Sequence, residues 1–116
     1  MGINIQIFGS LKCQNTNKAM RFFKERGIKF HFVDLKEKSI TAGELDNISR
    51  SVPIENLIDI DGKEYLKLNL KYIIHDIREK LLEFPLLFKT PVTRFGRLST
   101  VGYEPEIWKK WIESAK

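Results

Sequence analysis

The chain has 116 residues, 42% of them hydrophobic, and a formal net charge of +5. This length suits one domain with one hydrophobic core and is too short for two. Eight phenylalanines, two tryptophans and three tyrosines argue against intrinsic disorder. Basic residues are scattered among acidic ones without a basic run, which argues against direct nucleic-acid binding. We therefore expect residues 1–116 to form one monomeric domain.

The N-terminal residues and the single cysteine indicate the cellular compartment in which the protein works. The sequence MGINIQIF has no basic region followed by a long apolar run, so it indicates a strand and not a signal peptide. No apolar run approaches the roughly 20 residues that span a bilayer. Cys13 is the only cysteine and cannot form a disulfide within the chain, which fits a reducing compartment. We expect a cytoplasmic protein without membrane contact.

The first 35 residues predict a strand, a helix and a second strand. Isoleucines alternate with polar residues over 3–7, and Gly9-Ser10 then breaks the strand. Apolar residues recur at three- and four-residue spacing over 16–23, and Gly27 is placed to end this helix. Alternation over 29–33 predicts the second strand, parallel to the first because one helix joins them.

The middle of the chain, about residues 41–84, predicts a helical insertion. Thr41 and Glu44 form a candidate capping box for a helix through about Arg50, and Pro53 is placed to open a short turn. A stripe of apolar residues over 70–81 predicts one amphipathic helix that Pro85 ends.

The last quarter predicts a hairpin and a helix. Strands over 91–94 and 98–102 flank Phe95-Gly96-Arg97, and Pro105 opens a helix whose packing face includes two tryptophans. Together the elements predict an α/β fold with a mixed four-stranded sheet and a helical insertion.

Cys13 is the candidate reactive residue. It falls between the first strand and the first helix, where unpaired backbone N–H groups and the helix dipole stabilise an anion. The adjacent Lys12 adds a positive charge, which we expect to lower the thiol pKa further. The alternative is a buried cysteine that acts only as a small apolar residue. The position at a helix start favours the reactive thiolate.

Thr90-Pro91 is a second candidate element, at the start of the predicted hairpin. A proline here can adopt the cis form and present the preceding backbone to a bound chain. The alternative is a trans proline that opens an edge strand, and the residues alone leave both open. His31 and His75 have no second ligand at metal spacing, so we expect no metal site.

Three segments carry a resemblance to a known family. They are Lys12-Cys13-Gln14-Asn15-Thr16-Asn17-Lys18-Ala19, Lys89-Thr90-Pro91-Val92 and Thr100-Val101-Gly102-Tyr103, and together they resemble the glutaredoxin-like arsenate reductase and Spx family. The resemblance covers essentially the whole chain. It implies a thioredoxin-like (glutaredoxin-like) fold with a helical insertion, Cys13 as redox centre and a cis proline at Pro91.

The chain also departs from that family. Arsenate reductases of the family hold the oxyanion with arginines, one of them directly before the proline, where this chain has Thr90. Efficient arsenate reduction is therefore not expected, because a hydroxyl does not replace a bidentate guanidinium. Many Spx regulators have a C-x-x-C switch, but the position three after Cys13 is Thr16. Oxidation must then end in a mixed disulfide or a sulfenic acid.

These considerations favour a monothiol oxidoreductase that uses glutathione, or a protein thiol or disulfide, as co-substrate, with no tightly bound cofactor. The carboxylates of glutathione would meet Lys12, Arg94 or Arg97, although both arginines can equally be solvated charges of the hairpin. The alternative is a non-enzymatic Spx-like module that binds a protein partner such as RNA polymerase. The predicted catalytic residue is Cys13, and the predicted substrate-binding residues are Lys12, Thr16, Thr90, Pro91, Arg94 and Arg97.

Overall fold

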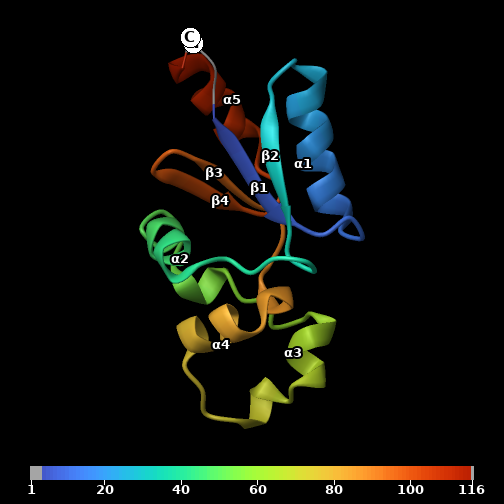
Figure 1. Cartoon of the computed structure of the whole chain (residues 1–116), viewed down its shortest axis with the longest axis vertical. Coiled ribbons are helices and arrows are strands. Elements are labelled where there is room, and N and C mark those ends of the chain that lie inside the picture. Colours follow the sequence, from blue (N-terminus) through green and yellow to red (C-terminus); the bar gives the residue numbers. More distant parts are fainter. Residues whose placement is uncertain (1–3, 116) are drawn as a thin grey trace.

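A mixed four-stranded sheet organises the computed structural model, which describes residues 4–115 (Figure 1). Its strands lie in the order β2-β1-β3-β4. β1 is parallel to β2 and antiparallel to β3, and β3 is antiparallel to β4. The strand bounds are β1 Ile5–Gly9, β2 Phe30–Asp34, β3 Val92–Phe95 and β4 Leu98–Val101. The predicted mixed sheet is confirmed; Ile3, predicted to open the first strand, lies outside the described residues.

Two helices, α1 (Gln14–Glu25) and α5 (Pro105–Ser114), pack against the sheet through one apolar cluster. Trp108 is fully buried there, and its indole N–H donates a 2.9 Å hydrogen bond to the Thr100 hydroxyl of β4. Its ring lies 5.3 Å from the rings of Phe22 and Phe23, centroid to centroid. Burying aromatic surface with the one polar atom satisfied is favourable, so this cluster holds both helices on the sheet.

The chain between β2 and β3 is helical and lies at one end of the sheet (Figure 1). A second apolar cluster joins it to Phe8 of β1 and Val92 of β3. The segment consists of α2 Ala42–Ser49, η1 Ile54–Asn56, α3 Lys63–Lys67, η2 Leu70–Tyr72, α4 Ile77–Glu83 and η3 Pro85–Leu87. No helix among residues 4–115 is both long and apolar enough to cross a membrane.

Local signals account for several helix ends. Both hydrogen bonds of the Thr41–Glu44 capping box are present at the start of α2. Pro105 occupies the first turn of α5, where a missing N–H costs nothing. Gly96 has φ +60° in the two-residue turn between β3 and β4, a conformation that suits glycine. The predicted hairpin and terminal helix are therefore confirmed.

The predicted continuous helix over 70–81 is wrong. Residues 70–72 form the short η2, Ile73 is extended, and α4 begins only at Ile77. Asp76 caps α4, because its carboxylate accepts a hydrogen bond from the Glu79 N–H at 3.0 Å. Ile73 and Ile74 are exposed and do not continue the apolar face. Helical spacing was thus present in the sequence, but a new cap interrupts the helix.

Candidate active site around Cys13

Cys13 lies at the N-cap of α1, four residues after β1 ends at Gly9. Its N–H donates to the Ser10 carbonyl at 3.0 Å, and its own carbonyl accepts from the Asn17 N–H at 3.1 Å. Thr16 lies directly against Gly9 at the end of β1. Only glycine fits there, because a Cβ at Gly9 would lie 2.4 Å from the Oγ1 atom of Thr16. Since Thr16 is fully buried, the start of α1 is held against the end of β1.

The Cys13 thiol is half-buried and its pKa is shifted. Burial raises the pKa of this thiol, because it disfavours the charged form. Hydrogen bonds from the hydroxyls of Thr16 and Thr90 and from the backbone of Thr16 and Asn15 lower it by more, so that the net pKa is below its ordinary value. The site therefore favours the thiolate, which is the nucleophilic form of cysteine.

Thr90 faces Cys13 from the segment that precedes β3. The Cys13 Sγ lies 3.7 Å from the Thr90 carbonyl oxygen, and the Thr90-Pro91 peptide bond is cis. The thiol can donate to this carbonyl, whereas the thiolate accepts from the Thr90 hydroxyl. Within residues 4–115 we find no backbone partner for the Thr90 N–H. This N–H is therefore available to a bound peptide.

A cleft of about 520 Å³ opens beside the Cys13 thiol. Its walls come from the start of α1, from the loop before α3 and from the segment that leads into β3. Two lysines and two carboxylates line it together with apolar side chains, and no arginine of the described residues does so. The lining residues are Ser10, Lys12, Cys13, Leu35, Asp59, Gly62, Lys63, Glu64, Pro85, Leu86, Phe88 and Thr90.

The structure brings Lys12, Thr16 and Thr90 to Cys13, but not the two arginines. Arg94 lies at the far part of the sheet, where its guanidinium donates to the Gln6 side chain at 2.9 Å and faces Glu44 at 3.7 Å. Arg97 sits in the turn of the hairpin, beyond Arg94. Because β3 leads away from Pro91 by about 3.3 Å per residue, neither arginine is placed to receive a ligand bound at Cys13. Neither arginine lines the cleft beside Cys13.

Lys12 is exposed, and the causes that lower the Cys13 pKa are hydrogen bonds from Thr16, Thr90 and Asn15. Lys12 lines the cleft beside Cys13. Sequence reasoning missed Lys63 and Phe88 as wall residues. Local sequence held no signal for them, because the fold brings them from the helical segment.

The sequence and the fold were compared with those of known proteins. No protein-family model matches the sequence. The curated relative "Global transcriptional regulator Spx 2" of Oceanobacillus iheyensis is 27% identical over 115 residues, which cover 95% of this chain and 84% of the relative. The solved arsenate reductase from Vibrio cholerae has a TM-score of 0.81 at 17% identity, over 95% of this chain and 98% of that one.

The sequence is thus similar to that of Spx 2, and the fold is similar to that of the arsenate reductase. A glutaredoxin from Archaeoglobus fulgidus also matches, with a TM-score of 0.50 and 17% identity over 95% of this chain and 86% of that one. The thioredoxin-like α/β fold predicted from the sequence is thus confirmed.

Proposed function

We propose that the protein is a glutathione-dependent thiol–disulfide oxidoreductase that works with a single cysteine. One observation carries this proposal: the Cys13 thiol, at the start of α1 and open to a cleft, has a pKa below its ordinary value because hydroxyl and backbone N–H groups stabilise the thiolate. Since the chain has no second cysteine, the resolving thiol must come from outside.

The reaction runs in two exchanges. The Cys13 thiolate attacks the glutathionyl sulfur of a mixed disulfide, forms a Cys13–glutathione disulfide and expels the substrate thiolate, which takes a proton from water. A glutathione thiolate then attacks the glutathionyl sulfur of this adduct, which releases oxidised glutathione and restores the Cys13 thiolate. In total, one glutathione thiolate enters, and it leaves as oxidised glutathione together with the glutathionyl group that came from the substrate.

Glutathione suits the cleft in two respects. Its peptide can pair with the unpartnered N–H and the carbonyl of Thr90, as an added strand pairs with a sheet edge. Its two carboxylates are anions that Lys12 and Lys63, which both line the cleft, would receive. Asp59 and Glu64 line the same cleft and would accept its ammonium group.

The direct test is turnover of a glutathionylated peptide, with glutathione and glutathione reductase, followed as NADPH oxidation. We expect activity that Cys13→Ser abolishes. Lys63→Gln should raise the KM for glutathione and leave the Cys13 pKa unchanged, with Lys89→Gln, outside the cleft lining, as the charge-matched control. Absence of turnover in a folded protein would contradict the proposal.

Arsenate is not the substrate we propose. The wall beside Cys13 has lysines and two carboxylates, but no arginine of the described residues to bind a tetrahedral oxyanion in bidentate fashion. We therefore expect no arsenite production above a Cys13→Ser control in the presence of glutathione and glutaredoxin. Robust production that depends on Cys13 would contradict this assignment.

A second candidate function is a regulatory module that binds a protein partner such as RNA polymerase. The observation that favours it is a run of exposed apolar side chains in the helical segment, at Leu66, Tyr72, Ile73 and Ile74. The Spx 2 relative is a transcriptional regulator by its name. Binding of purified RNA polymerase that Ile74→Lys weakens and Cys13→Ser leaves intact would favour this function over the enzyme.

A further inference from the structure

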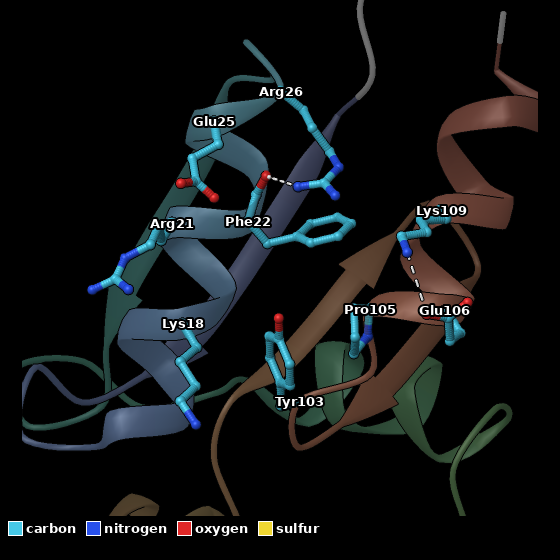
Figure 2. A pocket seen from close by; sticks show the side chains of 9 residues that line it. All are labelled: Lys18, Arg21, Phe22, Glu25, Arg26, Tyr103, Pro105, Glu106 and Lys109. Carbon is cyan, nitrogen blue, oxygen red and sulfur yellow. Dashed lines mark hydrogen bonds and ion pairs between the residues drawn. The ribbon is translucent and has the colours of Figure 1, made fainter.

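A second cleft, of about 500 Å³, lies between α1 and α5 and is separate from the cleft at Cys13 (Figure 2). None of the residues that line one cleft lines the other. Four basic and two acidic side chains line it, an excess of two positive charges. The volume is within the range of small-molecule sites, and the charge favours an anion.

One wall is a stripe along α1 in which Lys18, Phe22 and Arg26 follow one another at four-residue spacing. The Arg26 guanidinium carbon lies 3.7 Å from the centre of the Phe22 ring, and its Nη1 donates to the Phe22 carbonyl at 3.0 Å. Arg26 is thereby held in one orientation. Within residues 4–115 neither Lys18 nor Arg26 forms an ion pair with a carboxylate.

The opposite wall comes from the C-terminal segment. Lys109 of α5 faces the cleft across from Arg26, while Arg21 and Glu25 point to the outer side of α1 (Figure 2). Glu106, the carboxylate on this wall, is neutralised by Lys109 at 3.3 Å. The Lys109–Glu106 pair is therefore neutral, and among residues 4–115 the positive charge that faces the cleft without an ion-pair partner belongs to Lys18 and Arg26.

Tyr103 supplies a flat ring at one end of the cleft. It is 41% exposed, packs edge-on against Trp108 at 5.6 Å, and has the Lys18 ammonium 5.9 Å from its ring centre. An exposed ring that is fixed by a buried neighbour is a platform on which a base can stack. Eight residues separate Lys18 from Arg26, or about 12 Å along the helix, a span that suits an elongated ligand.

We propose that this cleft binds a nucleotide, with its base against Tyr103 and its phosphates between Arg26 and Lys109, which would exchange Glu106 for a phosphate oxygen. Guanidinium and ammonium groups bind phosphate oxygens through charge-assisted hydrogen bonds. The volume of about 500 Å³ between two helices favours a small ligand over a nucleic-acid duplex. The site is independent of the proposed function, since Cys13 is not part of it.

Calorimetric titration with ATP and with inorganic triphosphate tests the proposal, in a buffer of low ionic strength because phosphate contacts are screened by salt. We expect one site per chain. Arg26→Gln should weaken the binding of both probes by about tenfold, the order expected for loss of one charge-assisted contact. Tyr103→Ala should weaken the binding of ATP only, whereas Tyr103→Phe should keep it.

The matched control is Lys24→Gln, which removes one positive charge from the same helix at an exposed position outside the cleft. Cys13→Ser should bind ATP as the unaltered protein does. Equal losses in Lys24→Gln and Arg26→Gln would overturn the proposal, because binding would then follow net charge alone. Triphosphate binding as tight as that of ATP, unchanged by Tyr103→Ala, would overturn the stacking of a base.

Discussion

At the residue scale, Cys13 owes its thiolate character to hydrogen bonds and not to a nearby cation. Its position after the first strand was predictable from the sequence, since a Gly-Ser break and a helical repeat surround it. The contribution of Thr90 was not, because 77 residues separate it from Cys13. Proximity in sequence suggested Lys12, but an exposed lysine in water exerts little effect on a neighbouring thiol.

Thr16→Val tests this cause directly. Valine has nearly the shape of threonine but no hydroxyl to donate to the thiolate, so the midpoint of the alkylation rate against pH should rise. Lys12→Gln should leave the midpoint in place. A midpoint that moves with Lys12 and not with Thr16 would show that the charge of Lys12, and not the hydroxyl, stabilises the thiolate.

Thr16→Cys tests the geometry of the same turn. Because the Thr16 hydroxyl reaches the Cys13 sulfur in the folded chain, a thiol at this position should resolve a glutathione adduct. The expected product of oxidation is then an intramolecular disulfide, measured as a mass two hydrogens lower and no glutathione adduct. Persistence of the adduct would mean that the two side chains do not approach one another.

At the element scale, the helix starts and the hairpin follow from local sequence, whereas the break at Ile73 does not. Caps and turns depend on a few adjacent residues, such as Thr41 with Glu44. Apolar spacing over 70–81 is compatible with one helix or with two short ones, and only packing decides which side chains are buried. Leu70 and Leu81 are buried while Ile74 is fully exposed.

The attachment of α5 to β4 gives a stability prediction. Thr100→Val removes the acceptor of the buried Trp108 N–H and should lower the free energy of unfolding by about 1–3 kcal/mol, the cost of an unsatisfied buried donor. Thr100→Ser keeps an acceptor and should lose less. Urea unfolding of the three proteins measures both; equal losses for valine and serine would show that the methyl group, not the hydrogen bond, matters.

At the scale of the whole molecule, the site is a product of topology. The antiparallel pairing of β1 with β3 places the last residues of β1 beside the first residues of β3, and hence Cys13 and Thr90 at the same end of the sheet. The helical segment then closes one side of the cleft with Lys63 and Phe88. The same pairing places Arg94 beside Gln6, near the start of β1, and Arg97 follows in the turn beyond it. Closeness to Pro91 in the sequence therefore does not bring either arginine to Cys13.

The most direct test of a reactive Cys13 thiolate is the intact mass of the folded protein after incubation with oxidised glutathione. We predict one glutathione adduct, reversed by reductant and absent from Cys13→Ser, with a rate that rises with pH to a plateau at a midpoint below the roughly 8.5 of a free thiol. A folded protein whose Cys13 stays unmodified, or reacts only above that midpoint, would contradict the account.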